Sequence, residues 1–128
     1  MNPNDYQIEI EKFDLYSNEI KDQLENKTKD EVEQIMTTLM HFTGLAGEVG
    51  ELGEKIKKAI RDKKANPLLC PSREKLETIK KEFGDIEWYL TRAEADFGFT
   101  KSDVLQTNYN KLAKRMAENK LHGDGDNR

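Results

Sequence analysis

The chain has 128 residues and carries 25 acidic side chains against 21 lysines and arginines, a formal net charge of −4. This length suits one domain with a single core, and the acidic balance gives no general attraction to nucleic acid. The longest uncharged run, residues 34–47, is too short for a membrane span of about 20 residues. A lone Cys70 excludes an intramolecular disulfide, and the acidic, polar start is unlike a signal peptide, so we expect a cytoplasmic protein with no membrane contact.

Helical periodicity runs through the whole sequence, and no stretch alternates apolar and polar residues for long enough to predict a strand. The predicted fold class is therefore all-α, a bundle of four to five helices in a single domain. We expect the helices at residues of about 5–24, 28–63, 73–97 and 101–121. The tail from residue 122 is expected to be irregular.

Two helix boundaries have clear local signals. The string TKDE at residues 28–31 is a capping box, in which Thr28 caps the helix and Glu31 reaches back to it. The segment ANPLLCPS at residues 65–72 contains two prolines and ends on a candidate cap, Ser72. This segment is predicted to connect two antiparallel helices.

The first predicted helix has apolar residues around much of its circumference. Its inner side is expected to hold Tyr6, Ile10, Phe13 and Ile20. Further apolar residues, Ile8, Leu15 and Tyr16, lie off that stripe, and the third helix turns Trp88 away from its own stripe. A large second apolar surface usually marks an interface, so we expect a homo-oligomer, either a dimer or a tetramer.

The second helix carries a pair of acids beside its apolar stripe. An α-helix advances about 100° per residue, so Glu48 and Glu51 are neighbours on its surface. Lys55 and Lys58 lie on the same side, whereas Glu54 has turned toward solvent. The stripe beside the pair consists of Leu45, Val49, Leu52, Ile56 and Ala59.

The third helix repeats this arrangement with Glu82 at the edge of its stripe and Asp85 one step further out. The stripe here consists of Ile79, Phe83, Ile86, Leu90 and Ala93. If the two stripes pack antiparallel, both acid pairs converge on one cleft, where four carboxylates raise each other's pKa unless a cation lies among them. A hard divalent ion with oxygen ligands is the natural occupant.

Glycine recurs at every third position in GLAGEVGELGEK, residues 44–55, although each helical glycine costs about 1 kcal/mol relative to alanine. Gly44 falls on the carboxylate side, where a side chain would crowd the cleft. Gly47 and Gly50 leave a smooth back surface for another helix, and Gly84 is expected to do the same on the third helix.

The fourth helix offers groups that suit a polyphosphate. Asn108 falls within its apolar stripe, while Lys111 and Arg115 flank one edge, so two cations and an amide share one column. Tyr89 lies next to Glu82 around the third helix, where it is either a packing residue or a platform for a sugar or base. The stripe of the fourth helix consists of Val104, Leu105, Leu112 and Met116.

Two other classes of protein are consistent with a helical bundle. A di-iron carboxylate bundle needs E-x-x-H pairs, and neither His41 nor His122 follows an acid by three residues, so this class is excluded. A non-enzymatic helical interaction module would keep the apolar stripes, but it has no need for two aligned acid pairs. It remains the alternative to an enzyme.

At these residues the sequence resembles the MazG-like all-α nucleoside triphosphate pyrophosphohydrolases, whose signature is E-x-x-E on one helix and E-x-x-D on the next. The matching strings are EVGE at 48–51 and EFGD at 82–85, within the wider strings GLAGEVGELGEKIKK, KEFGDIEWYL and NYNKLAKR. The resemblance covers nearly the whole chain. It implies that Mg²⁺, or Mn²⁺, is bound by Glu48, Glu51, Glu82 and Asp85. It also implies that Asn108, Lys111 and Arg115 hold the triphosphate or sugar. Lys55, Lys58 and Tyr89, which lie on the side of the acids, are further expected substrate contacts.

The activity that the resemblance implies is water attack on the α-phosphorus of a nucleoside triphosphate, which releases a monophosphate and pyrophosphate and clears surplus nucleotides. Many members carry a second acid just before E-x-x-E, where this chain has Gly47. A water-activating role for that acid therefore does not transfer. Phosphoribosyl-ATP hydrolysis is the nearest competing activity among related folds.

Overall fold

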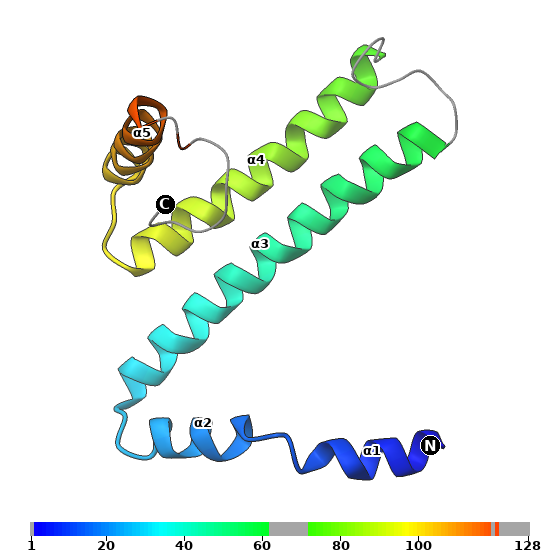
Figure 1. Ribbon diagram of the computed structural model, residues 1–128, viewed down its shortest axis with the longest axis vertical. Coiled ribbons are helices and arrows are strands. Elements are labelled where there is room, and N and C mark those ends of the chain that lie inside the picture. The colour runs from blue at the N-terminus through cyan, green and yellow to red at the C-terminus, as the bar shows by residue number, and fades with distance from the viewer. Residues whose placement is uncertain (1, 62–71, 119, 121–128) are drawn as a thin grey trace. The chain divides into compact units, whose positions relative to one another are not determined.

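The computed structural model describes residues 2–61, 72–118 and 120, and every element within them is a helix, which confirms the all-α prediction. The helices are α1 (Pro3–Glu11), α2 (Tyr16–Leu24), α3 (Lys29–Arg61), α4 (Arg73–Asp96) and α5 (Lys101–Ala117) (Figure 1). The chain divides into two compact units, residues 1–37 and residues 38–128. Of the predicted connection at 65–72, all but Ser72 lies outside the described residues, as does the predicted irregular tail.

The first unit corrects the prediction of one helix over residues 5–24. Helix α1 begins earlier, because Asn2 Oδ1 accepts hydrogen bonds from the backbone N–H groups of Asn4 and Asp5, both at 2.9 Å. The chain then leaves the helix and begins α2 at Tyr16. Asp14 explains this break, since its carboxylate accepts a hydrogen bond from the Tyr16 backbone N–H at 3.1 Å, a local bond that competes with helix continuation.

The predicted inner side of the first helix is uncovered in this unit. Neither α1 nor α2 contains a buried residue. The four side chains expected to face inward are all exposed, namely Tyr6, Ile10, Phe13 and Ile20. Ile8, Leu15 and Tyr16, expected to lie off the stripe, are exposed as well.

Helix α3 begins with the predicted capping box. The Thr28 backbone N–H donates to Glu31 Oε2 at 2.8 Å, and the Glu31 backbone N–H donates to Thr28 Oγ1 at 3.2 Å. These reciprocal bonds satisfy two of the N–H groups that a helix start leaves without partners.

In the second unit, α3 and α4 form an antiparallel hairpin, as predicted (Figure 1). Polar contacts between described residues join the helices: His41 Nδ1 lies 2.6 Å from Asp96 Oδ2, and Lys55 Nζ forms an ion pair with Glu82. Residue numbers rise along α3 as their partners' numbers fall along α4, which fixes the antiparallel register. Helix α4 begins at its predicted cap, where Ser72 Oγ accepts a hydrogen bond from the Lys75 backbone N–H.

A short turn leads from α4 to α5. Gly98 adopts a φ of 74°, a backbone conformation that favours glycine, and Thr100 Oγ1 caps α5 by accepting from the Asp103 backbone N–H at 3.2 Å. Lys101 Nζ lies 2.9 Å from carboxylate oxygens of both Glu87 and Glu94. These ion pairs attach the start of α5 to the last turns of α4.

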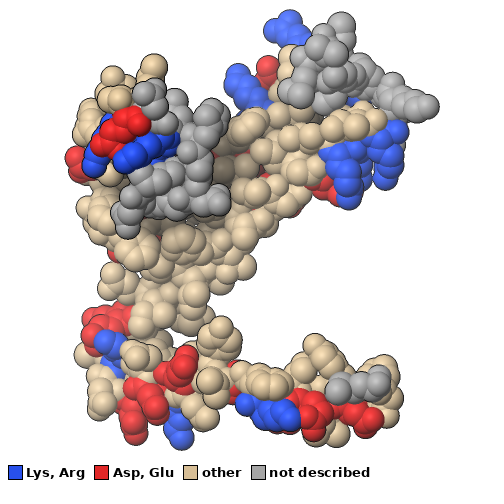
Figure 2. All heavy atoms as spheres, viewed as in Figure 1, with Lys and Arg blue, Asp and Glu red and all other residues tan. Residues whose placement is uncertain are grey.

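The second unit buries few apolar side chains. Among the described residues Ala93 is the one fully buried apolar residue, at 3% exposure, whereas Phe83 and Trp88 are each 56% exposed. In Figure 2 the visible face carries mostly uncharged side chains along the middle of the α3–α4 hairpin. The described part of a single chain therefore lacks the closed apolar core of a typical domain of this length.

Candidate metal and nucleotide site

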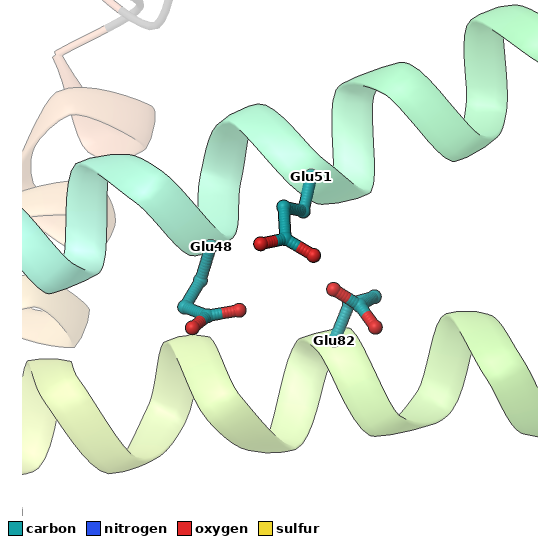
Figure 3. A group of neighbouring side chains, drawn as sticks. All are labelled: Glu48, Glu51 and Glu82. Carbon is teal, nitrogen blue, oxygen red and sulfur yellow. The ribbon is translucent and has the colours of Figure 1, made fainter.

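Three of the four predicted acidic residues converge between α3 and α4. Glu48 and Glu51 extend from adjacent turns of α3, Glu82 extends from α4, and their side chains point toward one another (Figure 3). One carboxylate oxygen from each lies within 4.8 Å of the others. This three-carboxylate cluster could hold a shared cation.

Glu82 is the buried member of the cluster. It is only 7% exposed, and its Oε1 is paired with the Lys55 ammonium. Its Oε2 is also buried and has no hydrogen-bond partner among the described residues. A buried carboxylate oxygen without a partner is costly, and a cation bound between α3 and α4 would satisfy it. The cluster thus fits a hard metal ion by both its donor atoms and its uncompensated charge.

The cluster is electrostatically strained by its own charges. Partial removal from water is the largest cause that raises the pKa of Glu48, followed by the charge of Glu51. The charges of Asp85 and Glu82 raise this pKa further, while Lys55 lowers it in part. The predicted mutual repulsion is therefore present at Glu48, and a bound divalent cation would relieve it.

Asp85 does not join the other three acids, which corrects the expectation of four convergent carboxylates. Its side chain is exposed, and it acts on Glu48 through its charge. Three residues separate it from Glu82, so it lies about 60° further around α4. This rotation places it at the solvent side of the cluster.

Tyr89 lies on α4, one turn after Asp85, and its ring explains why residue 44 is a glycine. A Cβ atom built on Gly44 would lie 2.2 Å from Tyr89 Cε1, so only glycine admits the ring at its present position. A Cβ on Gly47, Gly50 or Gly84 would meet nothing within 4 Å among the described atoms. The crowding predicted at Gly44 is thus found, with an aromatic ring as the neighbour.

The two lysines predicted beside the acids differ in their surroundings. Lys55 Nζ contacts Glu82 and lies 3.9 Å from Glu51 Oε2, so it belongs to the cluster. Lys58 instead lies 3.4 Å from Glu54 Oε1, on the outer surface of α3. Glu54, predicted to be a solvated acid, also pairs with Lys57.

The three residues of α5 that were predicted to hold a polyphosphate differ in their exposure to solvent. Asn108, which was predicted to fall within the apolar stripe of this helix, is exposed and shares with Lys111 a pocket of about 530 Å³. Arg115 is only 8% exposed. The pocket is lined by Phe99, Asp103, Val104, Thr107, Asn108 and Lys111, and none of the predicted metal ligands lines it.

The sequence analysis did not predict the part-buried pair of His41 and Asp96. Their side chains are joined at 2.6 Å although 55 positions separate them. The His41 and Trp88 rings form a T-shaped pair with their centroids 6.2 Å apart. The Trp88 and Tyr89 rings form another, with their centroids 4.7 Å apart. A histidine inside the uncharged run at 34–47 was the one available signal, and it did not indicate the partner.

Comparison with known proteins identifies the family. A family model for the MazG nucleotide pyrophosphohydrolase domain matches residues 34–118. The chain belongs to the MazG family. A relative, the Gene 37 protein of Mycobacterium phage L5, is 36% identical over 85 residues, which cover 66% of this chain and 71% of the relative. No solved structure gives a significant match.

The MazG match spans every residue predicted for the site, from Glu48 to Arg115, and excludes α1 and α2. It therefore agrees with the resemblance drawn from the two acid motifs, EVGE and EFGD. Within the described residues, no helix is long and apolar enough to cross a membrane.

Proposed function

We propose that this MazG protein hydrolyses nucleoside or deoxynucleoside triphosphates to the monophosphate and pyrophosphate, with Mg²⁺ or Mn²⁺ as cofactor. The observation that carries the proposal is the buried Glu82 carboxylate, which has a partnerless Oε2 and belongs with Glu48 and Glu51 to a group whose ligand oxygens lie within 4.8 Å of one another. Membership in a family of nucleotide pyrophosphohydrolases supports the substrate class. Removal of surplus nucleotides is the corresponding cellular role.

Glu48, Glu51 and Glu82 would hold the metal, and Asp85 would complete the site from its solvent side. When bound, the ion would neutralise phosphate oxygens, lower the pKa of the attacking water and stabilise the departing pyrophosphate. The oxygen of water forms a bond to the α-phosphorus, and the bond from that phosphorus to the α,β-bridging oxygen breaks. The electron pair of the broken bond leaves with pyrophosphate. No side chain acts as the nucleophile.

Other residues of the chain would position the substrate. Lys55, at the cluster, and Lys58, one turn further along α3, attract the triphosphate by charge. Tyr89 offers an aromatic edge to the sugar or base beside the carboxylates. Asn108, Lys111 and Arg115 remain proposed substrate contacts on α5, where Asn108 and Lys111 line the pocket and Arg115 is buried.

The working form is proposed to be a homodimer or homotetramer. Apolar side chains at the middle of the hairpin, such as Phe83 and Trp88, are more than half exposed, and large exposed apolar patches mark interfaces. Gly47 and Gly50 present backbone with open space around it, so another helix has room to approach. Association would supply the core that the described part of one chain lacks.

A panel of nucleoside triphosphates assayed for pyrophosphate release, with Mg²⁺ and with chelator, tests the proposed function. We expect release from at least one triphosphate with Mg²⁺ and none with chelator. Turnover of phosphoribosyl-ATP alone would assign the chain to the competing activity. Absence of turnover, together with no Mg²⁺ or Mn²⁺ binding by calorimetry, would favour a non-enzymatic interaction module.

A further inference from the structure

Lys55 places an ammonium group beside the carboxylates that are proposed to bind the metal. It follows Glu48 by seven residues and Glu51 by four, so it shares their face of α3. Its Nζ pairs with the buried Glu82 across the hairpin and lies 3.9 Å from Glu51 Oε2. The ammonium thus contacts two of the three carboxylates that would bind the metal.

We propose that Lys55 is an internal counter-ion that holds the metal-free cluster together and competes with the divalent cation for Glu82. This inference rests on the proposed metal site. A divalent ion drawn to Glu82 meets the positive charge of Lys55 at the same carboxylate, and the two repel each other. The ammonium therefore opposes metal binding while it stays on Glu82, and its release from Glu82 removes that opposition.

The side chain of Lys55 has the freedom that this exchange demands. It is 34% exposed, whereas the side chain of Glu82 is 9% exposed. The lysine can turn toward water by rotation about its own bonds, while the glutamate stays fixed between the helices. The released ammonium stays beside the cluster, where it is available to an anionic substrate.

The exchange also explains how the cluster tolerates the absence of metal. A buried carboxylate that loses its partner destabilises a fold strongly, and Lys55 prevents this at Glu82. The energetic cost of releasing the lysine then lowers the observed affinity for metal. Lys55 sets a balance between the stability of the metal-free protein and the strength of metal binding.

Titration of the full chain with Mn²⁺ by isothermal calorimetry tests the proposal, on the parent and on the variants Lys55→Met and Lys55→Arg. Lys57→Met is the control, because in the parent Lys57 pairs with Glu54 on the outer surface. We expect Lys55→Met to bind Mn²⁺ about tenfold more tightly than the parent, because one repelling charge is gone. Lys55→Arg, which keeps that charge, and Lys57→Met are expected to match the parent. Equal or weaker binding by Lys55→Met would overturn the proposal.

Thermal unfolding in chelator and in saturating Mn²⁺ adds a second measurement. The melting temperature of Lys55→Met should fall below that of the parent in chelator, and the difference should shrink when Mn²⁺ replaces the missing ammonium. A difference of the same size in both conditions would show a structural role alone and would contradict the competition. If the parent protein binds no Mn²⁺, the proposed metal site is refuted. If the parent binds Mn²⁺ and Lys55→Met binds it equally tightly, the metal site stands and only the competition by Lys55 is refuted.

Discussion

Replacement of Gly44 by alanine tests the contact that packs the Tyr89 ring against α3. The new Cβ would lie 2.2 Å from one ring atom, and ordinary contact begins at 3.4 Å, so the ring or the helix must shift by 1.2 Å or more. Alanine in a helix gains about 1 kcal/mol over glycine, while forced overpacking costs about 1–3 kcal/mol. The variant should therefore range from neutral to about 2 kcal/mol less stable than the parent.

Gly53→Ala is the matched control, because it lies on the same helix and its Cβ would meet nothing within 4 Å. The gain in helix propensity is common to both variants, so their difference isolates the clash with the ring. We expect Gly44→Ala to have the lower free energy of unfolding, by about 1–3 kcal/mol, in urea unfolding followed by circular dichroism. Equal protein concentrations keep any effect of association the same.

A background without the ring makes the test decisive. In Tyr89→Ala the crowding atoms are gone, so Gly44→Ala should then become as stable as Gly53→Ala. If Gly44→Ala already equals Gly53→Ala when Tyr89 is present, the ring does not lie over Gly44. A difference that persists without the ring would place its cause elsewhere on α3.

Three further substitutions test the metal ligands and the association of chains. Glu51→Gln and Asp85→Asn should each lower turnover at least about tenfold and leave helicity intact, because each removes a ligand charge and no core contact. Glu54→Gln is the control on the outer surface, and full activity in either ligand variant would refute the assignment. Trp88→Glu should shift sedimentation toward the monomer and lower the melting temperature, because it places a charge on an exposed apolar surface. A parent protein that is already an active, stable monomer at micromolar concentration would refute association.

The features that the sequence predicted well depend on local spacing. The capping box of Thr28 and Glu31 and the cap at Ser72 involve residues three apart, so propensity alone identified them. The positions of Glu48, Glu51 and Glu82 follow from helical periodicity once α3 and α4 pack antiparallel. Their convergence could therefore be predicted before any coordinates.

The features that the sequence did not predict depend on contacts between distant segments or on a single side chain. The ion pair of Lys55 with Glu82 requires the exact register of the hairpin, which periodicity leaves undefined. The burial of Arg115 depends on what covers α5, and a helical wheel does not contain that information. The break before Tyr16 did have a local signal in Asp14, whose carboxylate accepts from the backbone two residues on.

The position of water attack tests the central claim most directly. Hydrolysis of a turned-over nucleoside triphosphate in ¹⁸O-labelled water with Mg²⁺, followed by mass spectrometry of both products, shows which phosphorus receives the oxygen. Attack on the α-phosphorus predicts label in the monophosphate, none in pyrophosphate, and equal amounts of the two products. Label in pyrophosphate, or release of orthophosphate with a diphosphate, would contradict the account.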